Sequence, residues 1–230
     1  MKKVKNLIIL SLFPIFLLFF GGYTLHASPA LKLADSISSD LPIQVDQLKI
    51  LSWNIGFLPF EDLIQDVVGR ARGVAAAISQ KEYDIVLFEE AFNITARSII
   101  KKDLQTKYPY VYGPINKSSL SPKFNSGLWI LSKIPLEILR SIVFSDFAGF
   151  DGFARKGAVL LNGEFQGHEF QILATHLQDD EYPQEIREEQ LKEIEEKLIL
   201  PYNDPTVPQI ICGDFNTNQN NIHDYQRLLG

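Results

Sequence analysis

The 230-residue sequence predicts one α/β (α+β) domain in which mixed β-sheets are covered by helices. Apolar segments of strand length alternate with helical segments in the first half of the chain, which is typical of parallel β-α-β units. In the second half, two apolar segments flank Gly-containing turns, which is typical of an antiparallel hairpin. Hydrophobic residues make up 46% of the chain, enough for one sizeable core with little room for a second.

The strands are predicted from apolar runs bounded by turn residues. In chain order they are 48–53, 84–88, 127–131, 136–144, 157–161, 170–175 and 208–212. The hairpin between the strands at 157–161 and 170–175 can turn at either Asn162-Gly163 or Gln166-Gly167. Cys212, the only cysteine, lies in the last strand, where it is expected to be a small buried apolar residue, and it excludes an intramolecular disulfide.

Helices are predicted between and after these strands. Residues 61–79 keep a rough helical spacing of apolar side chains, and Asn93 is placed to cap a second helix. Pro183 opens a strongly acidic helix, whose charged residues are expected to form a solvated outer face. A polar helix is expected to close the chain.

The first 27 residues form a separate segment. A lysine-rich start precedes an apolar run over residues 7–20, and Ala27 supplies a small residue for cleavage. This order predicts that residues 1–27 are a cleaved signal peptide or a retained N-terminal membrane anchor. Both alternatives export the rest of the chain, so we expect a secreted, periplasmic or membrane-anchored protein.

Residues 28–46 have no clear periodicity and are predicted to be a linker to a folded domain at 47–230. The formal net charge of the chain is −6, and removing the three lysines of the leader, which contains no acidic residue, leaves −9. An acidic domain lacks the basic surface that long nucleic acid requires, so nucleic acid is a disfavoured partner. No feature of the sequence implies a protein partner.

Four of the predicted strands end abruptly in polar residues. These residues are Asn54, the pair Glu89 and Glu90, His176, and the pair Asp214 and Asn216. Each alone has an ordinary explanation as a strand end, a turn or a solvated charge. Because α/β folds bind ligands outside the carboxyl ends of their strands, we expect the four ends to converge on one pocket.

The chemistry of this set favours a hard divalent cation. Mg²⁺ prefers oxygen ligands and retains waters that a phosphate can replace. The set lacks the several His or Cys side chains expected for zinc. The chain also lacks a P-loop and a G-x-S-x-G nucleophile motif.

The order of the motifs SWN, EEAF, SGLWILSK, ATHLQ and GDFN resembles the endonuclease/exonuclease/phosphatase superfamily over residues 48–216. Within it, the chain is most similar to the neutral sphingomyelinases, including bacterial sphingomyelinase C. The segments that carry this closer similarity are 90–92, 156–157, 175–178, Arg187 and Gln190. The resemblance implies a deoxyribonuclease I-like, four-layer sandwich of two mixed sheets flanked by helices.

The resemblance also implies roles for the residues at the strand ends. Glu90 is the expected main Mg²⁺ ligand, helped by Asn54, and Mn²⁺ or Co²⁺ are alternative ions. His176 is expected to stabilise the phosphoryl oxygens or protonate the leaving group. Asp214 and Asn216 are expected to position the attacking water and the phosphate. Glu89 takes the place of the family's usual Gln.

Two departures from the sphingomyelinase pattern stand out. Asn125 occupies a position where that branch often has Asp, and no Ser-Asp-His element, which would supply the general base, follows Asn216. His223 precedes rather than follows an Asp and is interpreted as a surface residue. We therefore expect a domain that is incomplete at its C-terminus, or a short relative with altered function, and feeble catalysis by this chain.

The expected substrate is a phosphodiester of a phospholipid at a membrane surface. A deoxyribonuclease I-like nuclease, an inositol-phosphate phosphatase and a non-catalytic lipid- or metal-binding relative are the alternatives. Phenylalanines recur at every third position from Phe144 to Phe153. The favoured interpretation is that they pack beneath a Gly-rich loop, and the alternative is an aromatic surface that meets lipid headgroups.

Overall fold

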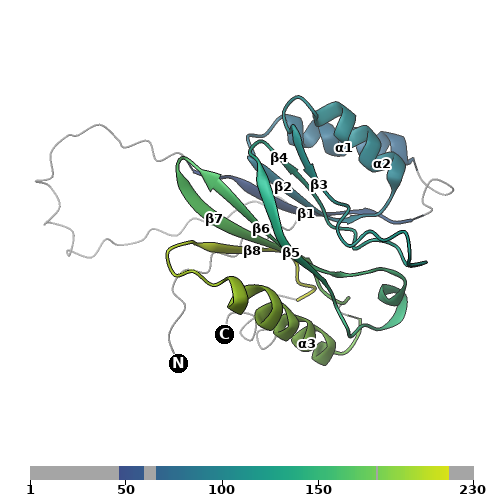
Figure 1. The fold of residues 1–230 in the computed structure, drawn as a ribbon. Helices are drawn as coiled ribbons and strands as arrows, with labels where there is room; N and C mark the ends of the chain where they lie inside the picture. Colours follow the sequence, from purple (N-terminus) through teal and green to yellow (C-terminus); the bar gives the residue numbers. More distant parts are fainter. Residues whose placement is uncertain (1–46, 60–65, 180, 218–230) are drawn as a thin grey trace, which may run out of the picture. The chain divides into compact units, whose positions relative to one another are not determined.

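A computed structural model describes residues 47–59, 66–179 and 181–217 (Figure 1). In this part of the chain the strands form two four-stranded sheets, with orders β1-β2-β4-β3 and β5-β6-β7-β8. The strands are β1 (Ile50–Phe57), β2 (Ile85–Ala91), β3 (Tyr110–Tyr112), β4 (Trp129–Ser132), β5 (Leu136–Val143), β6 (Gly157–Phe165), β7 (His168–His176) and β8 (Gln209–Asp214).

Each sheet combines parallel and antiparallel pairs. The β1–β2 and β7–β8 pairs are parallel, and the remaining pairs are antiparallel. The sequence-based prediction of mixed sheets is therefore confirmed. The two sheets pack face to face, because alternate residues of β2 (Ile85 and Leu87) share a buried apolar cluster with Val159 and Ile172 from β6 and β7.

Helices cover the outer face of each sheet (Figure 1). Helices α1 (Val67–Ser79) and α2 (Ile94–Leu104) pack on the other face of β2, around Val86 and Phe88. On the second sheet, α3 (Gln184–Ile194) continues into the π-helical turn η3 (Glu195–Ile199) and the 3₁₀ turn η4 (Leu200–Tyr202). The fold is the expected four-layer sandwich.

The ends of the helices follow their capping residues. Asn93 caps α2 as predicted, its Oδ1 accepting a hydrogen bond of 2.9 Å from the Ala96 amide. The predicted helix at 61–79 is helical from Val67, after Asp66 accepts a hydrogen bond from the Gly69 amide. Residues 61–65 of the prediction lie outside the described part.

The hairpin turns at Gln166-Gly167, whose φ angles of 54° and 80° suit a two-residue turn. The alternative turn residue, Gly163, instead lies within β6 opposite Phe170. Strand β3 was not predicted, since its three residues carry no clear alternation. It pairs with β4, and the Tyr112 hydroxyl accepts a hydrogen bond from the Leu136 amide, at the start of the second sheet.

The acidic helix has the expected solvated outer face, which includes Glu185 and Glu189, whereas its inner side buries three polar residues. Arg187, Gln190 and Glu193 are buried there because each binds backbone or side-chain groups of neighbouring loops. The predicted leader, linker and closing helix, with His223, lie outside the described residues. Among the residues that are described, no helix is long and apolar enough to span a membrane.

The same glycine-to-alanine change should have opposite effects at two positions. In Gly163→Ala the new methyl group would lie 2.6 Å from the Leu136 side chain and from the Phe170 ring, so we expect a loss of about 1–3 kcal/mol in unfolding free energy. Gly73 lies in α1 with no atom within 4 Å of an added Cβ, so Gly73→Ala should stabilise by about 0.5–1 kcal/mol. Urea unfolding of the two variants measures both effects. Equal shifts would contradict the packing described around Gly163.

Candidate active site

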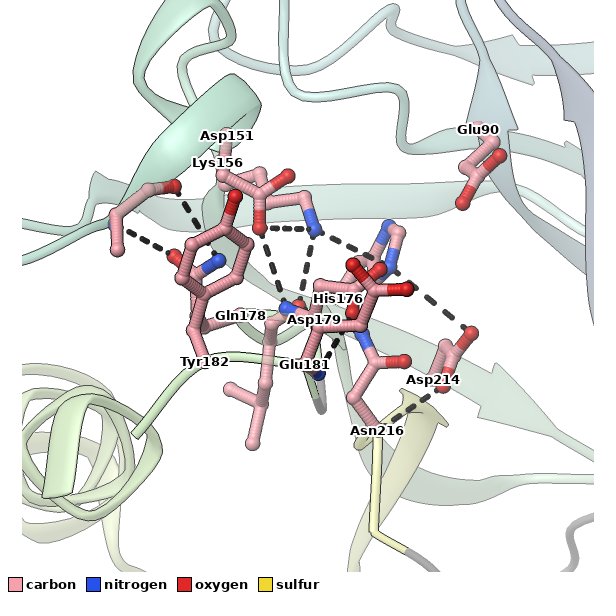
Figure 2. A network of polar contacts seen from close by, with 12 residues as sticks. Glu90, Asp151, Lys156, His176, Gln178, Asp179, Glu181, Tyr182, Asp214 and Asn216 are labelled. Atoms are coloured by element: carbon pink, nitrogen blue, oxygen red, sulfur yellow. Dashed lines mark hydrogen bonds and ion pairs between the residues drawn. The ribbon is translucent and has the colours of Figure 1, made fainter. Parts of the chain in front are cut away.

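The two sheets meet at the side chain of Asn54. Its Nδ2 donates hydrogen bonds to Glu90 Oε1 at 2.9 Å and to Asp214 Oδ2 at 3.0 Å. Asn54 and Glu90 belong to the first sheet, whereas Asp214 ends β8 in the second. His176 lies directly opposite Asp214 in the parallel β7–β8 pair. The structure therefore brings together four strand ends that the sequence marks only separately, and Figure 2 shows three of them at Glu90, His176 and Asp214.

The backbone around Asn54 and Glu90 departs from regular strand geometry. Strand β1 shifts register after Asn54, and Gly56, at φ 58°, donates from its amide to Asn54 Oδ1. Glu90 itself has a φ of 54°, an unfavourable value for a non-glycine residue. Such strain persists only where the surroundings enforce it, and it commonly marks functional positions.

Glu89 faces the interior, where Ser52 Oγ donates to its Oε1 at 2.6 Å. Burial raises the pKa of Glu89 to about 8, and the charges of Asp214 and Glu90 add to that increase while the Ser52 hydrogen bond opposes it. The carboxyl group is consequently mostly protonated at neutral pH. In that form it resembles the neutral Gln that the family resemblance places at this position.

His176 is buried at the end of β7, with 2% of its surface exposed. Its Nε2 lies 3.3 Å from Lys156 Nζ and 3.9 Å from Asp214 Oδ2. Burial lowers the pKa of His176 to about 3, helped by the positive charge of Lys156 and opposed by Asp214. The ring is therefore neutral, and a ring that accepts from Lys156 at Nε2 carries its proton on Nδ1.

Nδ1 of His176 is buried and, within the described residues, has no hydrogen-bond partner. A buried donor of this kind usually has a partner, and leaving it unsatisfied costs about 1–3 kcal/mol. An acceptor oxygen of a bound ligand is one group that would satisfy it.

The buried Lys156 forms an ion pair with the partly buried Asp151 beside His176 (Figure 2). Lys156 Nζ donates to Asp151 Oδ2 at 2.8 Å and to the Leu177 carbonyl at 3.0 Å, so the ammonium is held in place. Asp151 also accepts from the Asp179 amide. In the sequence, Lys156 is marked only by the family resemblance. Asp151 was missed, because it lies among the phenylalanines with no distinguishing spacing.

Asn216 is fixed just after β8. Its amide donates to Asp214 Oδ1 at 3.0 Å and its Nδ2 donates to the Leu177 carbonyl at 2.9 Å. The preceding Gly213 is required for close approach of β8 to β7, because a Cβ there would lie 1.9 Å from the Thr175 carbonyl oxygen. The Gly-Asp-Phe-Asn motif thus combines a packing glycine with two polar side chains that it holds beside His176.

The other residues of the sphingomyelinase resemblance serve the loop before β6. Gln178 bonds both the amide and the carbonyl of Ala148, and its own amide donates to Gln190. Gln190 in turn donates to the Asp146 carbonyl. Asn125 uses its side-chain oxygen locally, accepting from the Gly127 amide. These contacts position backbone segments around the site.

The donor set fits magnesium better than zinc. Within the described residues, no three His, Cys, Asp or Glu side chains gather as a metal cage. Mg²⁺ is commonly held by one or two carboxylates and several waters, with substrate phosphate completing its shell. Glu90 and Asp214, tied together by Asn54, supply oxygen donors of this kind at a partly exposed edge.

Residues 51–226 match the Endonuclease/Exonuclease/phosphatase family. The chain belongs to this family. Among its relatives, sphingomyelinase C 2 of Leptospira interrogans is 33% identical over 165 residues, which are 63% of this chain and 26% of the relative. A phospholipase C of Staphylococcus aureus is 30% identical over 159 residues, which are 60% of this chain and 47% of that protein.

Solved structures agree with these sequence matches. A beta-hairpin deletion mutant of Staphylococcus aureus beta toxin superposes with a TM-score of 0.70 and 26% identity, over 80% of this chain and 71% of that one. Sphingomyelinase C of Streptomyces griseocarneus has a TM-score of 0.70 and 25% identity, over 79% and 68% of the two chains. Another beta toxin variant was solved with bound magnesium ions. The chain spans less than half the length of the two sequence relatives above.

The buried Glu89 carboxyl should make stability depend on pH. Its pKa is raised from 4.5 to about 8, so the folded state holds a proton that the unfolded state releases over this range, and stability falls as pH rises. Glu89→Gln retains the acceptor for Ser52 and removes this dependence. We expect its advantage over the wild type to grow by up to roughly 1.4 kcal/mol per pH unit between pH 5 and 8.

Chemical denaturation in EDTA at several pH values measures this effect. Glu195→Gln, at an exposed position after α3, controls for the loss of one negative charge. Parallel pH profiles for the wild type and Glu89→Gln would show that the Glu89 carboxyl is ionised in the folded protein.

Proposed function

We propose that this domain is a Mg²⁺-dependent phosphodiesterase that acts on the phosphodiester of a phospholipid, as a sphingomyelinase does. The observation that carries the proposal is the Asn54 amide, which joins Glu90 and Asp214 beside the buried His176. The names of the sphingomyelinase and phospholipase C relatives support the substrate class. The acidic balance of the chain disfavours a nuclease.

In this proposal Glu90 is the principal ligand of Mg²⁺, and Asn54 orients its carboxylate. The ion, when bound, would supply positive charge that neutralises the phosphoryl oxygens. Asp214 and Asn216 orient a water molecule for in-line attack on phosphorus. The new bond forms between that water oxygen and phosphorus, and the bond from phosphorus to the lipid alkoxide oxygen breaks. The proton that the water loses is balanced by the proton that the departing alkoxide gains as it becomes the lipid alcohol.

His176 is suited to a donor role in this reaction. Because its pKa is lowered to about 3, the ring stays neutral across the physiological range and does not compete with Lys156 for negative charge. In this proposal the Nδ1 proton, which is buried and has no partner among the described residues, would be donated in a hydrogen bond to a phosphoryl or leaving-group oxygen that reaches the ring. Lys156 and Asp151 keep the ring in position.

Removing the Glu90 carboxylate should weaken magnesium binding. We expect Glu90→Gln to lower the Mg²⁺ affinity of the protein by at least about tenfold, and Asn54→Ala to lower it by about 10–100-fold through loss of the orienting hydrogen bond. Isothermal titration calorimetry of the full chain with Mg²⁺ measures both. His176→Ala is the control that should retain binding, and a Glu90→Gln protein with undiminished affinity would refute the assignment of the ligand.

Turnover should depend on both Mg²⁺ and His176. We expect hydrolysis of sphingomyelin by this chain to be abolished by EDTA and reduced by about 100-fold or more in His176→Ala. Released phosphorylated headgroup measures this, with a plasmid-nicking assay beside it. Turnover that persists in EDTA would contradict the metal dependence, and nicking without lipid hydrolysis would favour a nuclease. Mg²⁺ binding without either activity would favour a non-catalytic relative.

A further inference from the structure

Three phenylalanines are exposed on the loop that carries Asp151. The side chains of Phe147, Phe150 and Phe153, on and just before the 3₁₀ turn η2 (Gly149–Phe153), are 43%, 85% and 63% exposed. Only Phe144 of the every-third-residue series is buried. The favoured interpretation from the sequence, packing beneath a loop, is therefore wrong for these three, because their side chains are exposed.

The exposed loop is held in place by its backbone. Both backbone groups of Ala148 bond the buried Gln178, and the Asp146 carbonyl accepts from the buried Gln190. At the other end of the loop, the Phe124 amide donates to the Phe153 carbonyl. The phenylalanines are thus presented to solvent by an ordered scaffold, and little conformational entropy is lost when they meet a partner.

The loop that carries the three exposed phenylalanines adjoins the candidate active site. Phe147 lines a cavity of about 150 Å³ whose walls also include Asp151 and Lys156. Lys156, in the wall of this cavity, also contacts His176 Nε2 through its Nζ. Figure 2 shows Asp151 and Lys156 between the loop and the His176 ring. A surface that meets the aromatic loop would therefore also lie beside the candidate catalytic groups.

The charges around the loop are mixed. Lys123 Nζ lies 4.1 Å from the centroid of the Phe147 ring. Two acidic residues near the loop, Asp146 and Asp179, are also exposed. Phe150 and Phe153 pack with their ring centroids 6.3 Å apart, forming an apolar pair. Attraction by this surface is thus expected to come from burial of apolar area and not from net charge.

We propose that Phe147, Phe150 and Phe153 insert into the interface of a phospholipid bilayer and bring the lipid headgroups to the site. We call the segment 147–153 the aromatic docking loop. The proposal rests on the proposed action on phospholipid. A zwitterionic bilayer is the partner that fits, since it presents an apolar boundary for the rings without requiring a basic surface. Binding through this loop should be almost insensitive to salt.

The test places a fluorescent reporter in the loop of the full chain. In Phe150→Trp, vesicles of sphingomyelin and phosphatidylcholine should shift the added tryptophan emission to the blue, and brominated acyl chains should quench it. The wild-type spectrum corrects for the two native tryptophans. The reporter senses only its own surroundings, so any membrane binding by residues 1–27 does not produce the signal.

Leu200→Trp is the matched control, because Leu200 is exposed on η4 after the far end of α3. We expect no shift there. Adding Phe147→Ser and Phe153→Ser to the Phe150→Trp protein should reduce the shift several-fold at fixed lipid. Circular dichroism checks that each variant is folded.

The measurement is made in EDTA, so it is independent of metal binding and turnover. An unchanged Phe150→Trp emission would overturn the docking loop even if hydrolysis is observed. An equal shift at Leu200→Trp, or a shift that disappears at high salt, would also overturn it. Insertion without hydrolysis would uphold the docking loop while the proposed catalysis fails.

Discussion

A single side-chain amide connects the two halves of this fold at their polar edge. Asn54 can donate to Glu90 and Asp214 at once because both sheets end their parallel strands at the same place. Each carboxylate alone would be a partly exposed strand end. Because both carboxylates accept a hydrogen bond from the Asn54 amide, they lie close together and form a concentrated negative site. A hard cation requires a site of this kind. The packing of the sheets thus determines the chemistry.

Burial determines the charge of the groups around this edge. Glu89 is mostly protonated and His176 is neutral for the same reason, since the sandwich interior disfavours the charged form of either group. Lys156 remains close to His176 because Asp151 and the Leu177 carbonyl hold its ammonium. Negative charge is thereby carried by the partly exposed carboxylates, while Glu89 and His176 are neutral hydrogen-bonding groups on the interior side, beside the Lys156–Asp151 ion pair.

The glutamine residues of the sphingomyelinase resemblance have a structural explanation. Gln178 and Gln190 are buried and form a chain of hydrogen bonds to the loop that carries Asp151. That loop supplies the partner of Lys156 on one side and exposes Phe150 on the other. One set of buried amides therefore supports both the polar site and the aromatic surface.

The sequence by itself determined the apolar strands, the Asn93 cap and the polar residues that end the strands, because periodicity, capping chemistry and strand-end polarity are local properties. It left the hairpin turn open and missed β3 and Asp151, whose roles come from contacts made by distant segments. Only the tertiary structure decided that Glu89 points inward, that Phe150 points outward, and that Asn54 meets Asp214 across 160 positions. Burial and long-range contact are properties of the packed chain, so no local pattern can specify them.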